Sequence, residues 1–156
     1  MGPFHPRPGP DGYDFGPADA YVEFGIKHDL YVVGHTLVWH GQTPNWVFAG
    51  TNPPPLGTTN PPPALAAGTN GPSTNRLGRG GFGPGFGRYT GPRASREELL
   101  QRMSNHIHTV VGRYEGRVKV WDVVNEALAD DQGTNVLRTL LWSEIIGPDF
   151  IAHAFR

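Results

Sequence analysis

Two short runs of apolar residues have the composition of strands buried within a parallel sheet. The first run spans residues 30–39 and the second spans residues 118–126. Both are rich in β-branched and aromatic residues, and the second ends abruptly in polar groups. Continuous apolar runs of this length are typical of strands that are covered on both faces. We therefore predict two parallel strands, each buried on both faces.

Apolar residues at helical spacing predict helices between and after these strands. The clearest helix begins at Ser95, because Ser95 and Glu98 have the spacing of a capping box. Its apolar positions recur every three or four residues as far as Tyr114. Two further helices are predicted, one over residues 136–146 and one that begins at Pro148.

Another helix is predicted before the first strand, because Pro17 can open it. Its expected apolar face consists of Ala20, Tyr21, Phe24 and Ile26, and Gly25 weakens it. The resulting order is helix, strand, helix, strand, helix. This order is typical of the α/β class, in which helices cover a parallel sheet. We therefore predict an α/β fold.

The segment from residue 50 to residue 92 differs in composition from the rest of the chain. Gly, Pro, Asn and Thr dominate it, and the unit at 51–55 recurs at 59–63. Consecutive prolines favour extended conformations, and the glycine-rich part offers little to bury. We interpret 50–92 as a disordered low-complexity loop that interrupts one partial domain, residues 1–156. Its Arg and aromatic residues faintly resemble RNA-binding Arg-Gly segments, but a loop is the favoured interpretation.

Composition and charge exclude several classes of function. The formal net charge is −1 and the sequence pI is about 6.6, so no basic field would attract nucleic acid or an anionic membrane surface. No stretch approaches the roughly 20 apolar residues of a membrane span, and the first residues lack the pattern of a signal peptide. The chain contains no cysteine, which excludes thiolate metal sites and disulfides. We expect no nucleic-acid partner and no membrane association.

Polar and aromatic residues gather where the two predicted strands end. In parallel β/α folds this edge is the open face at which reacting groups collect. Asp122 and Glu126 share one parity, so both carboxylates point the same way if the strand stays regular. A carboxyl group buried there tends to hold its proton to higher pH, as a general acid requires. On spacing alone, the favoured alternative is that both carboxylates cap the strand and pair with Lys or Arg.

The histidines at the end of the first strand suggest no metal site. His35 and His40 are five residues apart, so in a regular strand they face opposite sides and cannot share a metal ion. No phosphate-binding or dinucleotide-binding motif is present either. We therefore predict neither a metal nor a cofactor.

Two long segments resemble signature sequences of the family 10 glycoside hydrolases, the β-1,4-xylanases. Residues 35–46, His-Thr-Leu-Val-Trp-His-Gly-Gln-Thr-Pro-Asn-Trp, look like the family's third-strand signature, and residues 121–127, Trp-Asp-Val-Val-Asn-Glu-Ala, look like its fourth-strand signature. Residues 16–22, 95–115 and 147–155 are similar to helices of the same family. The resemblance implies a fragment of a TIM (β/α)8 barrel and retaining endo-hydrolysis of xylan.

The resemblance also implies roles for individual residues. Glu126 would be the acid/base that protonates the glycosidic oxygen. The residues that would bind the sugar are His35, Trp39, Gln42 and Asn125, and those that would support the site from behind are His40 and Asp122. Aromatic faces suit xylose rings, and amide and imidazole groups suit its hydroxyls. The implied partner is xylan or a xylo-oligosaccharide, and this chemistry needs no cofactor. Nothing here indicates an oligomeric state.

Parts of the family pattern are missing from the 156 residues. A complete barrel normally needs roughly 250 residues. Retaining glycosidases use two carboxyl groups about 5 Å apart, and nothing after Glu126 resembles the Thr-Glu-Leu-Asp type sequence that carries the family's nucleophile. The first strand and the Asn-x-Met-Lys-Trp segment of the second are absent as well. A truncated reading frame and a natural remnant gene both explain this pattern.

These gaps set the expectations for the isolated chain. Because two strands leave sheet edges exposed, we expect a poorly folded or aggregated polypeptide without appreciable xylanase activity. The alternative functions are a non-catalytic carbohydrate-binding remnant and an interaction protein that acts through residues 50–92. For the parent enzyme we expect an extracellular or periplasmic location.

Overall fold

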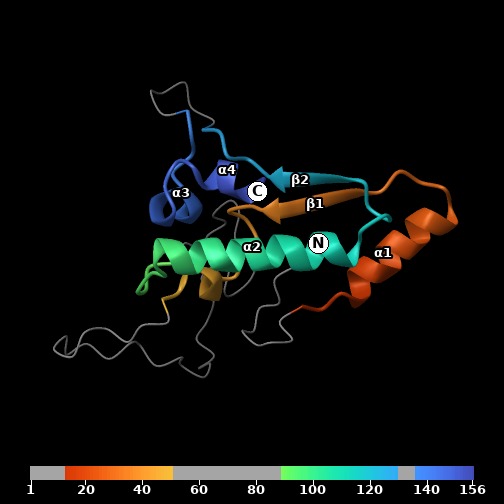
Figure 1. Ribbon diagram of the computed structural model, residues 1–156, viewed down its shortest axis with the longest axis horizontal. Coiled ribbons are helices and arrows are strands. Elements are labelled where there is room, and N and C mark those ends of the chain that lie inside the picture. Colours follow the sequence, from red (N-terminus) through yellow and green to blue (C-terminus); the bar gives the residue numbers. More distant parts are fainter. Residues whose placement is uncertain (1–12, 51–88, 130–135) are drawn as a thin grey trace, which may run out of the picture.

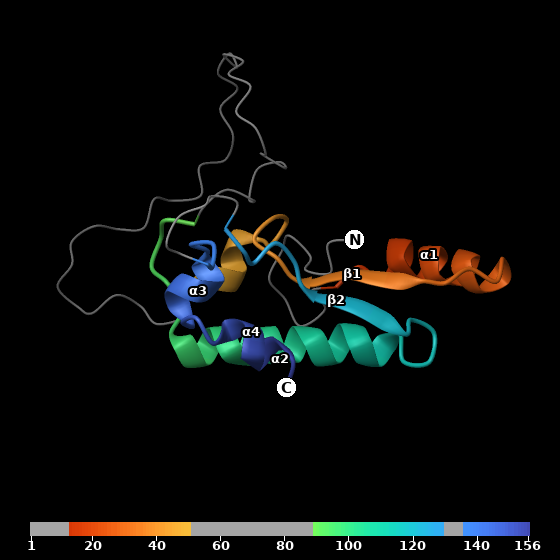
Figure 2. The same cartoon turned by 90° about the horizontal axis from the view of Figure 1, so that it is seen from above.

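The computed structural model of the chain describes residues 13–50, 89–129 and 136–156. Two parallel strands form its sheet, and helices lie beside them and at both ends (Figures 1 and 2). In chain order the elements are α1 (Gly16–Lys27), β1 (Val33–Val38), the short 3-10 helix η1 (Asn45–Phe48), α2 (Arg96–Arg113), β2 (Val120–Val124), α3 (Leu141–Ile145) and α4 (Phe150–Ala154). The predicted α/β order is confirmed, and most of the predicted loop at 50–92 lies outside the described residues.

The sheet consists of β1 and β2, which pair in parallel. Val33 pairs with Val120 and His35 with Asp122, and the register is irregular between His35 and Val38. The peptide bond between His35 and Thr36 is cis. Helix α2 runs along the strand pair and supplies the crossover that two parallel strands require. As a result the carboxyl ends of β1 and β2 lie side by side, close to α3 and α4 (Figure 1).

The predicted burial of both strands on both faces is wrong. β1 alternates between exposed and buried residues over its first half, and no residue of β2 is fully buried. Val33 and Val120, which pair at the start of the sheet, are both exposed. The physical reason is that helices cover one face of the strand pair, and within the described part of the chain the sheet has no third strand.

The core lies between α2 and the strands. Helix α2 buries Leu99, Met103, His106 and Val110 on the face toward β1. Trp142 of α3 and Phe150 of α4 complete the core at the carboxyl ends of the strands. The predicted capping box of α2 is confirmed, since the Ser95 hydroxyl accepts from the Glu98 N–H and the Glu98 carboxylate accepts from the Ser95 N–H.

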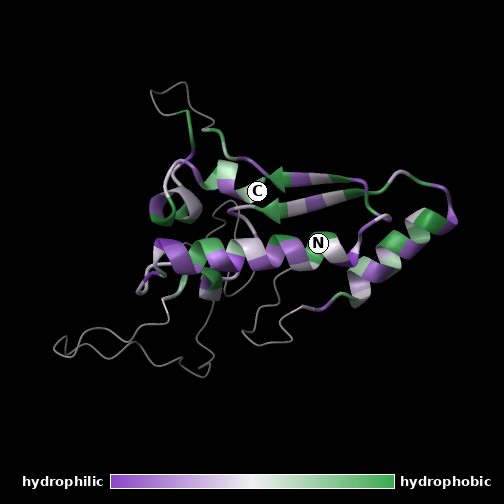
Figure 3. Ribbon diagram, viewed as in Figure 1, coloured by the Kyte–Doolittle hydropathy of each residue, from purple (hydrophilic) through white to green (hydrophobic). Residues whose placement is uncertain are grey.

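The apolar face predicted for α1 is wrong. All four of its predicted residues are exposed, Tyr21, Phe24 and Ile26 by more than half of their surface. The buried positions of α1 are Val22 and Gly25. A Cβ on Gly25 would lie 2.3 Å from Cγ2 of Val32, so the absence of a side chain allows the helix to approach the strand. In Figure 3 much of the α1 ribbon, at the end of the molecule away from α3, has the colour of hydrophobic residues.

The last two helices are shorter than predicted. Helix α3 begins only at Leu141, because residues 136–138 turn back against residues 127–129 through an antiparallel bridge between Leu128 and Leu137. Helix α4 begins at Phe150 rather than at Pro148. None of the helices in the described ranges is long and apolar enough to span a bilayer.

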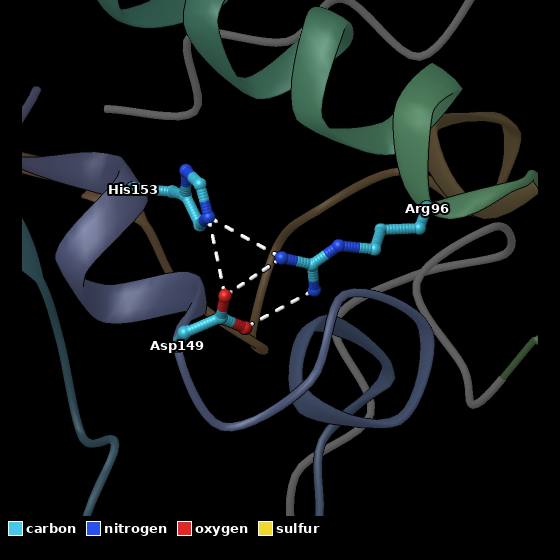
Figure 4. A network of polar contacts seen from close by, with 3 residues as sticks. All are labelled: Arg96, Asp149 and His153. Carbon is cyan, nitrogen blue, oxygen red and sulfur yellow. Dashed lines mark hydrogen bonds and ion pairs between the residues drawn. The ribbon is translucent and has the colours of Figure 1, made fainter.

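A polar network on the surface joins α2 to the start of α4 (Figure 4). The Arg96 guanidinium donates two hydrogen bonds to the Asp149 carboxylate, at 3.1 and 2.7 Å. His153 lies 3.2 Å from the same carboxylate. The hydrogen bonds from Arg96 are the main reason that the pKa of Asp149 falls to about 2.

Candidate active site

The seven residues predicted for the site lie in two segments, at the ends of β1 and β2. Residues 35–42 come from β1 and the turn after it, and residues 122–126 come from β2 and the two positions beyond it. Since the strands are parallel neighbours, these segments meet at one edge of the sheet (Figure 1). The structure therefore brings together residues that are more than 80 positions apart in the sequence.

Glu126 contacts two of the other predicted residues. The indole Nε1–H of Trp39 donates to Oε2 of Glu126 at 3.0 Å. Nε2 of His40 lies 3.7 Å from the same oxygen. The Glu126 side chain is 50% exposed, so the carboxylate is open to solvent and to a ligand while one of its oxygens is held by an aromatic donor.

His35 and Asp122 form a second pair beside Glu126. Nδ1 of His35 lies 2.9 Å from Oδ2 of Asp122, and the two residues face each other in the register of the sheet. The Thr36 hydroxyl donates to the Asp122 carbonyl at 2.8 Å, which fixes the backbone of this pair. A carboxylate on Nδ1 favours the tautomer that carries its proton there, so Nε2 of His35 becomes the acceptor.

The predicted burial of the two carboxyl groups is wrong. The side chains of Asp122 and Glu126 are 53% and 50% exposed. Their expected common orientation assumed a regular strand, but β2 ends at Val124 and Glu126 has a positive φ of 51°. The alternation that places both carboxylates on one side therefore does not continue to Glu126.

Trp39 is held at its backbone as well as at its ring. Its carbonyl accepts from the Thr43 hydroxyl at 2.6 Å and from the indole N–H of Trp142 at 3.1 Å. A Cβ on Gly41 would lie 2.8 Å from the Trp39 ring, so the turn after β1 must pass close to this indole. The His35 and His40 rings lie 6.2 and 5.7 Å from it, centroid to centroid. The three rings make an aromatic cluster, in which Trp39 and His40 contact the Glu126 carboxylate.

Gln42 and Asn125 are placed by their backbones. Asn125 donates its N–H to the Val38 carbonyl at 2.9 Å, which continues the pairing of the strands by one step. Gln42 has a positive φ of 61°. In the described part of the chain only three non-glycine residues have a positive φ, namely Asp29, Gln42 and Glu126. Such conformations persist where the surroundings enforce them, and they gather at functional sites.

A hollow lies beside Glu126 on the side of α4. Its volume is about 700 Å³, and it is open to solvent. The lining residues are Val124, Glu126, Ala127, Leu128, Ala129, Arg138, Ile151 and Phe155. Glu126 is the only residue of the predicted site among the lining residues of this hollow.

Two residues at the site were not predicted from the sequence. Arg138 donates from Nε to the Glu126 carbonyl at 3.2 Å. Trp142 donates from its indole N–H to the Trp39 carbonyl at 3.1 Å. Both contacts end on backbone carbonyls, which are present at every position and leave no trace in a residue pattern. Within the described ranges no three His, Asp or Glu side chains are grouped so that they could hold a metal ion.

The parallel strands, the connecting helix and the site at the carboxyl ends define a fragment of a TIM (β/α)8 barrel. Solved barrels with this arrangement include xylanase XynB from Paenibacillus barcinonensis, with a TM-score of 0.67 and 34% identity. That comparison covers 97% of this chain and 34% of the XynB chain. An endo-1,4-β-xylanase from Caldicellulosiruptor owensensis has a TM-score of 0.63 and 35% identity, with 96% and 33% of the two chains covered.

Residues 2–58 and 86–156 match the profile of glycosyl hydrolase family 10, and the chain belongs to that family. A β-1,4-xylanase from Dictyoglomus thermophilum is 38% identical over 151 residues, which cover 97% of this chain and 30% of the relative. An endo-1,4-β-xylanase from Geobacillus stearothermophilus is 40% identical over 124 residues, 80% of this chain and 26% of the relative. The chain thus spans about a third or less of the length of these relatives.

Proposed function

We propose that this chain carries the acid/base side of a site that hydrolyses β-1,4-xylosidic bonds in xylan with retention of configuration. The observation that supports this proposal best is the solvent-open Glu126 carboxylate at the carboxyl end of β2, 3.0 Å from the Trp39 indole N–H. A carboxyl group in that position can donate a proton to a glycosidic oxygen and later activate a water molecule.

The neighbouring residues have the chemistry to hold a xylose unit beside Glu126. Trp39 offers an apolar ring face and His35 offers Nε2 as an acceptor for a hydroxyl, because Asp122 occupies Nδ1. Asn125 and Gln42 can each donate and accept hydrogen bonds to hydroxyls. Structures similar to this chain include a family member in complex with xylotriose and one with xylotetraose, which supports xylo-oligosaccharides as the ligand class.

Turnover needs more than Glu126. A retaining glycosidase requires a nucleophilic carboxylate about 5 Å from the acid/base, and Asp122 is engaged with His35. We assign no residue of this chain to the nucleophile. We therefore also propose that the isolated chain binds xylo-oligosaccharides without appreciable turnover.

Nuclear magnetic resonance of the full 156-residue chain tests the binding step. We expect xylotetraose to shift the Trp39 indole N–H signal, assigned with the variant Trp39→Phe, and to leave the Trp46 signal in place. Cellotetraose is the control for the choice of sugar. An unchanged Trp39 signal at millimolar xylotetraose would refute the binding site.

Release of reducing sugar from xylan tests the chemical step. We expect the same background rate for the wild-type chain and for Glu126→Gln. A wild-type rate above that of Glu126→Gln would support the role of Glu126 and would overturn the expected lack of turnover.

A further inference from the structure

Glu126 adopts a backbone conformation that non-glycine residues rarely adopt, and something in the fold must hold it there. Its φ is 51°, directly after a strand that ends at Val124. The orientation of its carbonyl group is set by ψ, the other backbone torsion at Glu126. A hydrogen bond to this carbonyl therefore restrains the direction in which the Glu126 side chain leaves the chain.

Arg138 supplies that hydrogen bond. Its Nε donates to the Glu126 carbonyl at 3.2 Å. The Arg138 backbone is itself anchored, because its N–H donates to the Ala127 carbonyl at 2.8 Å. The Ser143 hydroxyl lies 3.3 Å from the Arg138 carbonyl and 3.0 Å from the Leu140 carbonyl, which share its single proton. The start of the Arg138 side chain is therefore held close to the Glu126 carbonyl that its Nε reaches.

The Trp39 side of the contact between Trp39 and Glu126 is anchored by the same part of the chain as Glu126. Trp142, four residues after Arg138, is buried and packs edge-on against Phe48 with the ring centroids 5.0 Å apart. Its indole N–H donates to the Trp39 carbonyl at 3.1 Å. Residues 138–143 thus hold the carbonyls of both Glu126 and Trp39, whose side chains meet at 3.0 Å.

We propose that Arg138 is a positioning residue, which orients Glu126 through its backbone carbonyl and so keeps the carboxylate against the indole of Trp39. Trp142 fixes the Trp39 side of the same contact. This inference rests on the proposed function, because it assigns to Arg138 the task of aiming the acid/base. Arg138 acts through Glu126, and the assignment requires no contact between Arg138 and the sugar.

The test follows the Trp39 indole proton while the Glu126 carboxyl group is titrated. In the wild-type chain we expect this signal to move with the titration, and we expect Glu126→Gln to abolish the movement. Arg138→Met, which reaches as far as the Nε position but has no donor, is expected to reduce the amplitude at least twofold. Arg138→Lys is expected to restore at least half of the loss. Arg117→Met, in the turn between α2 and β2, is the matched control and should leave the amplitude unchanged.

An Arg138→Met chain that is folded and shows the wild-type amplitude would overturn the inference. If that variant does not fold, hydrogen exchange in the wild-type chain tests the inference instead. The Nε–H of Arg138 must then exchange with solvent more slowly than that of an exposed arginine such as Arg156. Exchange at the exposed rate would also overturn the inference. A chain that shows the titration but binds no xylotetraose refutes the proposed function alone, so the two failures are distinguishable.

Discussion

Lowering the pH from 7 to 4.5 is expected to destabilise the fold through His106. This residue is 1% exposed and lies in the core on the face of α2 toward β1. Its Nδ1 lies 3.2 Å from the Tyr13 hydroxyl. Burial is the main cause that lowers the pKa of His106 from 6.5 to about 3, and a hydrogen bond with the backbone of Leu37 opposes the shift. A charged imidazole in this buried position would lose its hydration.

The direction and size of the effect follow from the two pKa values. Between pH 3 and 6.5 the unfolded chain binds a proton at His106 and the folded chain does not, so stability falls as the pH falls through this range. The contribution is fully present above pH 6.5. The free energy of unfolding is therefore about 2.5 kcal/mol lower at pH 4.5 than at pH 7. Complete domains are stable by only about 5 to 15 kcal/mol. Since a fragment with two strands is expected to be less stable than that, this loss is large.

Urea unfolding followed by tryptophan fluorescence at the two pH values measures the loss. His106→Asn keeps a polar group near Tyr13 and removes the titration, so we expect its stability to change by less than half as much between pH 7 and 4.5. Asp149, whose pKa is lowered to about 2, loses its contribution to stability mainly below pH 4.5. If His106→Asn loses as much stability as the wild-type chain over the same range, the reasoning is wrong.

Two further predictions concern α1 and α2. Gly25→Ala is expected to destabilise the fold by about 1 to 3 kcal/mol in urea unfolding, because the new Cβ would lie 2.3 Å from Val32. The control Gly112→Ala, with no atom within 4 Å of the new Cβ, is expected to stabilise α2 by about 0.5 to 1 kcal/mol. Phe24→Glu on the exposed face of α1 is expected to reduce self-association in sedimentation experiments, because Tyr21 and Phe24 are 55% and 57% exposed. An unchanged sedimentation profile would contradict that role for the face.

The parts of the fold that the sequence predicted are those in which one local signal is sufficient. The capping box at Ser95 requires only two residues at a fixed spacing, and the structure contains both of its hydrogen bonds. The two strands were recognisable from their apolar runs. The burial of those strands could not be predicted, because the same apolar run fits a strand covered on one face or on two. The prediction of the buried face of α1 failed for a related reason. Gly25 is the point at which the helix approaches Val32 closely, whereas in a sequence pattern glycine is only a weak helix former.

In the candidate site, contacts between side chains could be predicted from the sequence, whereas contacts with the backbone could not. The residues around Glu126 could be named because their two segments resemble family signatures, and the structure places Trp39 and His40 next to the carboxylate. Arg138 and Trp142 could not be named, since each acts on a carbonyl of another segment. A contact of that kind depends on the path of the chain between the partners, so it becomes visible only once β2, the turn after it and α3 are placed together. Donors to backbone carbonyls of another segment are therefore the residues most easily missed when only side-chain patterns are considered.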